Sequence, residues 1–168
     1  GASTITQQVA KNFLLTNEVS YERKIKQAIL AYRIEQAYSK DRILELYLNQ
    51  IYLGQGSYGV AAASLDYFNK RLDELTIGEA AYIAGLPKAP ENYNMFRKPK
   101  EAKWRRDWVI GRMLEDGRIS RDEAVAAKEE KNESLQFAGW TLDMAQRRLT
   151  APHGDPVEIS TREVDLLL

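Results

Sequence analysis

Repeated helix-start signals, each followed by apolar residues at four-residue spacing, most constrain the fold of this chain. The first signal is Thr4 with Gln7, which forms the T-x-x-Q version of a capping box. Ile5, Val9 and Phe13 then recur every four residues, so we expect them to share a buried stripe on one face of a helix. The pattern predicts an amphipathic helix that begins near Thr4.

Similar signals continue along the chain and predict further helices. Ser20 and Ser39 are candidate N-caps, and Thr76 with Glu79 and Ser120 with Glu123 form further capping boxes. Glycine or proline follows several of the apolar stretches and predicts where they end. The expected helices cover residues 20–38, 39–53, 61–68, 76–85, 100–116 and 120–131. Together with the first helix they predict a compact, mainly α-helical domain.

Two of these helices carry conspicuous apolar stripes. Ile25, Ile29 and Tyr32 share one face of the second helix. Trp104, Trp108 and Val109 lie on the helix over residues 100–116. We expect the second of these stripes to point inward.

The pattern changes at about residue 134. Short alternating segments and the turn-rich stretch 151–156 predict a small antiparallel β segment, and residues 160–163 predict the start of another helix. We therefore expect two units, a helical domain over residues 1–133 and a β segment over residues 134–168.

Composition excludes several classes of protein. The 168 residues contain 44% hydrophobic residues, which suffices for a core, and no cysteine, which excludes disulfides and thiolate metal sites. The net charge is zero, which argues against a non-specific polyanion binder, although residues 1–42 hold seven Lys/Arg against four Asp/Glu. No apolar run is long enough to span a membrane and no signal peptide is visible, so the chain by itself is expected to be soluble.

The polar side of the first helix is a candidate binding surface. Gln8 and Lys11 lie opposite the apolar stripe and offer amide and ammonium donors to a phosphate-bearing ligand. The free N–H groups at a helix start also favour an anion. The alternative is an ordinary capped surface helix. The candidate residues are Ser3, Thr4, Gln7, Gln8 and Lys11.

A second candidate surface follows in the next helix. Arg23, Lys24 and Gln27 share one helix face because they are three and four residues apart. The two cations can hold a pyrophosphate, arginine as a planar fork and lysine as a point charge. The alternative is a solvated basic face.

Four segments in order resemble the signatures of one enzyme family. They are residues 1–12 (GASTITQQVAKN), Arg23-Lys24-x-x-Gln27, residues 40–49 (KDRILELYLN) and residues 105–113. Together they resemble the glycosyltransferase domain of class A penicillin-binding proteins and monofunctional peptidoglycan glycosyltransferases. The resemblance covers residues 1–133.

This resemblance implies a lysozyme-like helical fold that polymerises lipid II in bacterial cell-wall synthesis. A lipid-pyrophosphate chain is then the donor, and the 4-hydroxyl of an incoming lipid II attacks with inversion. The substrate-binding residues it implies are Ser3, Thr4, Gln7, Gln8, Lys11, Arg23, Lys24 and Tyr52. Glu45 with Asn49, and Arg105 with Arg106, are expected to be structural, the first two as a hydrogen-bonded pair and the arginines through acidic partners.

The resemblance names no catalytic residue in this chain. The family's main acidic residue belongs to a segment that precedes its first signature here, and Gln27 occupies the second acidic position. An amide cannot act as a base, so we expect this chain to be inactive by itself.

The resemblance also implies partners and a location. The partners are lipid II, the nascent glycan chain and, for the parent protein, the membrane surface at the outer face of the bacterial plasma membrane. The cofactor stays open, with a divalent cation as one alternative.

The tail is similar to a different family. Phe137, Trp140 and the segment Ile159-Ser160-x-x-Glu163 resemble the N-terminal part of an OmpR-type winged-helix DNA-binding domain. The elements that read DNA come later in that family, so no nucleic-acid partner is expected. The alternative function is therefore a non-catalytic chimera in which the helical part is only a scaffold.

Overall fold

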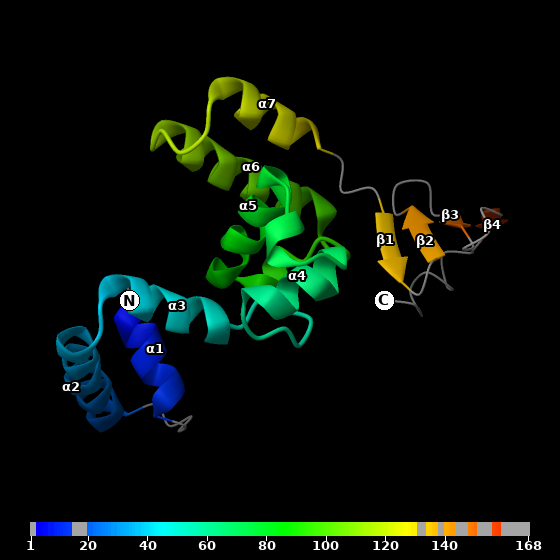
Figure 1. Cartoon of the computed structure of the whole chain (residues 1–168). Coiled ribbons are helices and arrows are strands. Elements are labelled where there is room, and N and C mark those ends of the chain that lie inside the picture. Colours follow the sequence, from blue (N-terminus) through cyan, green and yellow to red (C-terminus); the bar gives the residue numbers. More distant parts are fainter. Residues whose placement is uncertain are drawn as a thin grey trace.

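The computed structural model describes residues 3–14 and 20–130 and the backbone of four short strands further along the chain (Figure 1). The helices are α1 (Ile5–Phe13), α2 (Tyr21–Ala37), α3 (Lys40–Gln50), α4 (Val60–Phe68), α5 (Ile77–Gly85), α6 (Pro99–Glu115) and α7 (Arg121–Glu129). Three short 3₁₀ helices are η1 (Leu72–Glu74), η2 (Leu86–Lys88) and η3 (Pro90–Asn92). The prediction of a mainly helical fold is confirmed.

The predicted N-caps form as hydrogen bonds. The Thr4 hydroxyl accepts from the Gln7 amide at 3.1 Å, and the Gln7 side chain accepts from the Thr4 amide at 3.2 Å. Ser20 and Ser39 cap α2 and α3 in the same way, and the two later capping boxes are also present. These bonds satisfy amide groups that have no partner inside the helix, which is why the helices begin where the sequence predicts.

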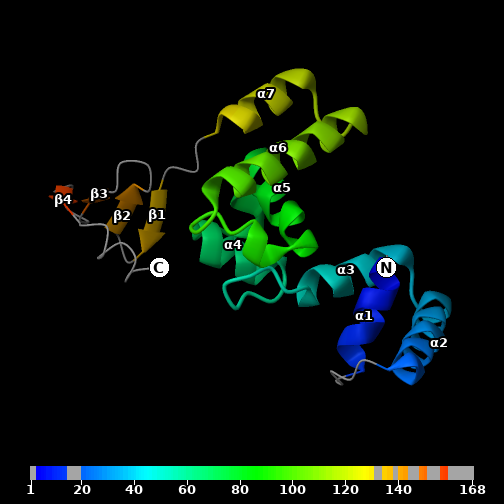
Figure 2. The same ribbon diagram turned by 180° about the vertical axis from the view of Figure 1, so that it is seen from behind.

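The first three helices pack together as one lobe. α1 lies against α2 and α3, and Figures 1 and 2 show this lobe at one end of the molecule. The buried residues of its core are Val9, Ala10, Ala31, Ile34 and Ile43.

The remaining helices form a second body around α5. One face of α5 contributes Tyr82 to a core with Leu53 and Tyr67, and the other contributes Ala81 to a core with residues of α6 and α7. Burial raises the pKa of Tyr67 to about 12, and its hydroxyl donates to the Leu53 carbonyl at 2.9 Å. Among the described residues, the core of the first lobe and the two cores around α5 share no residue, so the two parts have separate cores.

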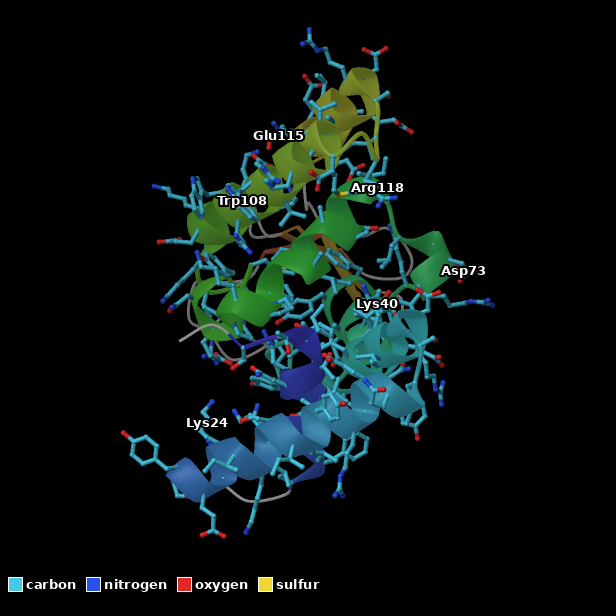
Figure 3. All side chains as sticks on the ribbon, turned by 90° about the vertical axis from the view of Figure 1, so that its left-hand side faces the viewer. Lys24, Lys40, Asp73, Trp108, Glu115 and Arg118 are labelled. Carbon is cyan, nitrogen blue, oxygen red and sulfur yellow. The ribbon has the colours of Figure 1, made fainter. Side chains whose placement is uncertain are left out.

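The stripes expected to be buried on α1 and to point inward on α6 contact the core only in part. Val9 is buried and Val109 packs against the core, whereas Ile5 and Phe13 are 42% and 51% exposed. The expectation is therefore wrong for the larger side chains. Ile25 is 61% exposed and Trp104 is 59% exposed. Figure 3 shows Trp108 at the outer side of α6. The buried faces are instead Gln27, Ala31 and Ile34 in α2, and Ala102, Arg106 and Ile110 in α6. Small side chains allow the helix axes to approach closely, and the larger side chains then lie outside the contact.

A tight loop joins α3 to α4. Its backbone pairs Tyr52 with Tyr58 in an antiparallel bridge. Gly54 and Gly59 have φ values of 87° and 85°, and an added Cβ would lie 2.7 Å from the Tyr67 hydroxyl and 2.6 Å from the Asn49 carbonyl oxygen. These two positions therefore require glycine.

The tail contains a four-stranded antiparallel sheet in the order β1-β2-β3-β4. The strands are β1 (Ser134–Phe137), β2 (Trp140–Asp143), β3 (Arg148–Thr150) and β4 (Pro156–Glu158). Leu135 pairs with Leu142, and Leu149 pairs with both Leu142 and Val157. The helix expected from residue 160 lies outside the described residues.

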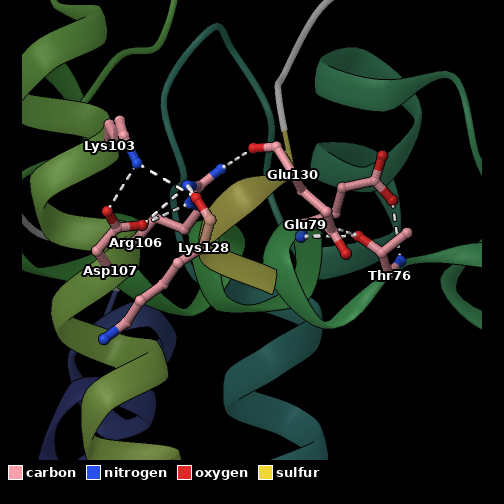
Figure 4. A network of polar contacts seen from close by, with 7 residues as sticks. All are labelled: Thr76, Glu79, Lys103, Arg106, Asp107, Lys128 and Glu130. Atoms are coloured by element: carbon pink, nitrogen blue, oxygen red, sulfur yellow. Dashed lines mark hydrogen bonds and ion pairs between the residues drawn. The ribbon is translucent and has the colours of Figure 1, made fainter. Parts of the chain in front are cut away.

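A buried arginine joins α6 to the end of α7 (Figure 4). Arg106 is 2% exposed and donates to the carbonyl oxygens of Glu130 and Lys128, each at 2.9 Å. It also donates to Asp107 at 2.8 Å and 2.9 Å. The Glu130 carboxylate accepts from the Thr76 hydroxyl at 2.7 Å, so this network also attaches the start of α5.

We predict that Arg106→Met lowers the free energy of unfolding by about 3 kcal/mol, because it leaves two carbonyl oxygens and Asp107 without their buried donor. Urea denaturation measures this change. The matched control is Arg112→Met, an exposed arginine of the same helix that pairs with Glu115, for which we expect less than about 1 kcal/mol. Equal effects of the two substitutions would contradict the prediction.

We also predict that the contribution of Asp107 depends on pH. Partial burial opposes ionisation of this carboxyl, but Lys103 and Arg106 outweigh it and lower its pKa. A lowered folded-state pKa stabilises the fold above the ordinary carboxyl pKa, and this stabilisation is lost as pH falls through the folded-state value. Asp107→Asn should therefore destabilise the fold at pH 7, and this difference should shrink as pH falls below the ordinary carboxyl pKa. Thermal unfolding across this range, with Asp73→Asn as the exposed control, tests the prediction.

Candidate functional site

The predicted residues of α1 divide into two groups. Thr4 and Gln7 engage each other in the capping box and so hold the start of the helix. The Gln8 amide nitrogen lies 3.5 Å from the Ser3 carbonyl oxygen, and Lys11 is exposed. The ammonium group of Lys11 and the amide of Gln8 are thus the donors that this face offers.

The packing of α2 brings the second predicted group to the same face. α1 and α2 run in opposite directions, as Figure 1 shows, and the Gln27 amide nitrogen donates to the Gln7 carbonyl oxygen at 2.5 Å. One turn further along α1 is Lys11, and one turn back along α2 is Arg23. Antiparallel packing therefore sets these two residues at the same level of the helix pair.

The charge of this face is positive. α1 contains no acidic residue, and the Glu22 carboxylate of α2 pairs with Lys26 at 2.6 Å. Lys11 and Lys24 are exposed and form no ion pair with any residue that the structure describes. Figure 3 shows Lys24 extending from α2, and Arg23 is half-buried. We name Gln8, Lys11, Arg23 and Lys24 the α1–α2 face.

Tyr52 does not contact the α1–α2 face in the described structure. It follows α3, and its hydroxyl donates to the Glu91 carboxylate at 3.1 Å, while its ring centroid lies 5.1 Å from that of Tyr58. Both partners belong to the second body, so these contacts do not join Tyr52 to the α1–α2 face. The hydrogen bond to Glu91 raises the pKa of Tyr52. Sequence reasoning missed Glu91, because 39 residues separate it from Tyr52 and no periodic pattern connects them.

Glu45 and Asn49 do not form the expected hydrogen bond in the described structure. Glu45 pairs with Arg42 at 2.6 Å instead, one turn earlier on α3. A guanidinium three residues away is a stronger partner for a carboxylate than an amide. The backbone carbonyl of Asn49 lies against Gly59 and so helps to fix the loop after α3.

Arg105 and Arg106 differ in their partners. Arg106 binds Asp107 and two backbone carbonyls, as described above. Arg105 has no acidic partner among the described residues. It donates to the Gly85 carbonyl at 3.2 Å and lies over the Trp108 ring at 4.2 Å. Trp108 is thus a cation–π partner on the surface rather than a core residue.

The described residues show neither a metal centre nor a membrane span. No group of three or more His, Asp or Glu side chains in them is arranged to hold a metal ion. Within the same residues, no helix is both long and apolar enough to cross a bilayer.

The chemistry available at the α1–α2 face is the binding of a multiply charged anion. Two ammonium groups, one guanidinium and one amide lie on two helices that are in contact. No described carboxylate on this face is placed as a base, because Glu22 is paired and position 27 is an amide.

We predict that Glu91→Gln lowers the pKa of Tyr52, because it weakens the hydrogen bond that the Tyr52 hydroxyl donates to the carboxylate and removes the negative charge that opposes the tyrosinate. Carbon-13 labelling of the tyrosine rings and titration by NMR above pH 9 measure this change. Glu74→Gln, a neutralised carboxylate on η1, is the control and should leave the Tyr52 titration unchanged. An unchanged Tyr52 pKa in Glu91→Gln would contradict the contact.

Comparison with known proteins gives a consistent set of relatives. The family model described as Transglycosylase matches residues 1–114. The penicillin-binding protein 1A of Rickettsia conorii is 64% identical over 127 residues, which cover 76% of this chain and 16% of that protein. The penicillin-binding protein 1A of Neisseria flavescens is 51% identical over 164 residues, which cover 92% of this chain and 20% of that protein.

A solved structure agrees with these matches. The crystal structure of penicillin-binding protein 1A from Haemophilus influenzae superposes with a TM-score of 0.54 and 42% identity over 74% of this chain and 16% of that one. The chain therefore spans no more than about a fifth of these relatives. The match over 92% of the chain extends beyond residue 133, and these similarities do not support the alternative of a chimera with a scaffold role.

Proposed function

Because this chain belongs to the transglycosylase family, we propose that it takes part in peptidoglycan glycan-strand polymerisation and binds the lipid-linked donor. The α1–α2 face is the proposed site for the pyrophosphate of that donor. The donor is then the growing lipid-linked glycan chain, and the acceptor is an incoming lipid II.

The observation that carries this proposal is the contact between α1 and α2, the two helices on which the cations lie. The Gln27 to Gln7 hydrogen bond sets α1 and α2 against each other, and Lys11, Arg23 and Lys24 lie on the two helices that it joins. Cations on one helix alone would be explained equally well by an ordinary basic surface exposed to solvent. Cations on two helices in contact favour a ligand with several negative charges, and α1 itself contains no acidic residue.

The chemistry of glycosyl transfer gives such a site a role. As the bond between the sugar and the pyrophosphate breaks, negative charge develops on the leaving pyrophosphate. Fixed cations beside that group stabilise the transition state more than the ground state. Lys11, Arg23 and Lys24 are proposed to act in this way.

The proposal for this chain is confined to donor binding. Transfer also needs a base that removes the proton of the acceptor hydroxyl, and the α1–α2 face offers no unpaired carboxylate among the described residues. Tyr52, in the loop after α3, is proposed to line a more distant part of the substrate site. The parent protein is proposed to act at the outer face of the bacterial plasma membrane, where a lipid-linked donor is held.

We predict that Lys11→Ala and Arg23→Ala each weaken binding of a lipid II analogue by about tenfold, which corresponds to the loss of one hydrogen bond to a charged group. Isothermal titration calorimetry with the analogue in detergent micelles measures the affinity. Lys100→Ala removes an exposed lysine from α6 and is the matched control, for which we expect no change. Equal affinity in all three variants and the unmodified chain would contradict the proposed site.

A further inference from the structure

The loop between α3 and α4 is a short hairpin with two different faces. The Leu53 amide donates to the Ser57 carbonyl oxygen at 3.0 Å, and Tyr52 lies opposite Tyr58 in the antiparallel bridge. Neighbouring residues of an extended chain point to opposite faces, so Leu53 and Ser57 share one face and the two tyrosines share the other. Burial agrees with this arrangement, because Ser57 is 2% exposed and Tyr58 is 66% exposed.

Helix α4 binds the buried face of this hairpin at two points. The Tyr67 hydroxyl donates to the Leu53 carbonyl oxygen at 2.9 Å, and the Asp66 carboxylate accepts from the Ser57 hydroxyl at 2.5 Å. Leu53 and Ser57 belong to the two opposite arms of the hairpin. Two successive residues of one helix therefore hold both arms. We name these two hydrogen bonds the α4 clamp.

The hairpin needs such support because its own backbone does not favour it. Gly54, Gln55 and Gly56 have φ values of 87°, 54° and 78°. Glycine adopts this left-handed region freely, whereas the Cβ of Gln55 crowds the carbonyl that follows it. An isolated hairpin is also marginally stable at best in water. Contacts from outside the hairpin, the α4 clamp among them, therefore hold its conformation.

The exposed face of the hairpin depends on this position. The Tyr52 hydroxyl donates to the Glu91 carboxylate of η3 at 3.1 Å. A shift of the hairpin by roughly 1 Å on α4 would lengthen this contact beyond hydrogen-bond range. The place of the Tyr52 phenol is thus linked to the bond between Ser57 and Asp66 on the other face.

We infer that Asp66 is a positioning residue that fixes the hairpin on α4 through Ser57 and so sets the place of Tyr52. The Asp66 side chain is on the exposed surface of α4 and acts without touching a ligand. The inference rests on the proposed function for the part that Tyr52 plays in the substrate site. The effect of the α4 clamp on the contact between Tyr52 and Glu91 does not depend on that function.

The first test uses the pKa of Tyr52 as a reporter of the hairpin position. The hydrogen bond to Glu91 raises this pKa. Asp66→Ala and Ser57→Ala each remove one partner of the same clamp bond, so we expect each to lower the Tyr52 pKa toward its value in Glu91→Gln. Titration of carbon-13-labelled tyrosine rings by NMR measures this change, and circular dichroism verifies that each variant is folded.

Asp66→Asn is the matched control for the charge at this position. It removes the negative charge but keeps an oxygen that accepts from the Ser57 hydroxyl, so the Tyr52 pKa should stay near its value in the unmodified chain. Asp66→Ala added to Glu91→Gln should cause no further lowering, because both substitutions act on the same contact. The inference is overturned if Asp66→Asn and Asp66→Ala have equal effects, if the double variant is additive, or if Asp66→Ala leaves the Tyr52 pKa unchanged.

The second test measures binding of a lipid II analogue to the full chain by calorimetry in detergent micelles. We expect Asp66→Ala to weaken binding about threefold, a small part of the binding free energy, and Asp66→Asn to leave it unchanged. Asp73→Ala removes an exposed carboxylate from η1 and should change neither the affinity nor the Tyr52 titration. A shifted Tyr52 pKa with unchanged affinity in Asp66→Ala would show that Asp66 only supports the hairpin, and its positioning role would be wrong.

The two proposals fail in different ways. If Lys11→Ala and Arg23→Ala leave binding of the analogue unchanged, the proposed function fails, while the Tyr52 titrations still decide the effect of the α4 clamp. If those substitutions weaken binding and Asp66→Ala does not, the function stands and the role of Asp66 is wrong.

Discussion

Close contact between helices through small residues is the constraint on which the rest of this structure depends. Seven of the sixteen buried apolar residues in the described chain are alanines, and they lie in α1, α2, α4, α5, α6 and α7. On α5, Gly78 and Gly85 extend this pattern, because a Cβ at either position would meet atoms of the end of α7 or of Arg105 within 3.0 Å. When the helix axes lie this close, tryptophans and isoleucines are left at the edges of the contacts. This accounts for the exposed Trp104 and Ile25.

Where helices pack this closely, buried polar groups determine how they fit together, because a buried polar atom needs a hydrogen-bond partner at the contact itself. Arg106 and Gln27 do this in the two parts of the molecule. Arg106 binds the carbonyls at the end of α7, and Gln27 binds the Gln7 carbonyl in the first turn of α1. Each hydrogen bond is directional, whereas contact between alanines is not. Each bond therefore fixes how one helix lies along its neighbour, which the alanine contacts alone do not determine. The first holds the second body together, and the second organises the α1–α2 face.

The function proposed for this chain follows from that organisation. Lys11 lies on α1, and Arg23 and Lys24 lie on α2. The cations of either helix alone would be an ordinary basic surface. Because the two helices are in contact, the proposed site has several positive charges, and α1 contributes no acid to it. Tyr52 and Glu91 lie away from it, in contacts of the second body, so the proposed substrate site has separate parts on the two sides of α3.

The sequence by itself determined where the helices begin and end, because caps, glycines and prolines act within a few residues of their own position. It also determined the family, because four signatures stand in order within residues 1–113. The tertiary structure alone decided which helix face is buried. Periodicity favoured Ile25 and Trp104, whereas the packed helices bury Ala31, Ala102 and Arg106, because close approach selects small side chains and paired polar groups. It also decided the partners of Gln27, Arg105 and Tyr52, since each contacts a residue about 20 or more positions away, and no local pattern carries that information.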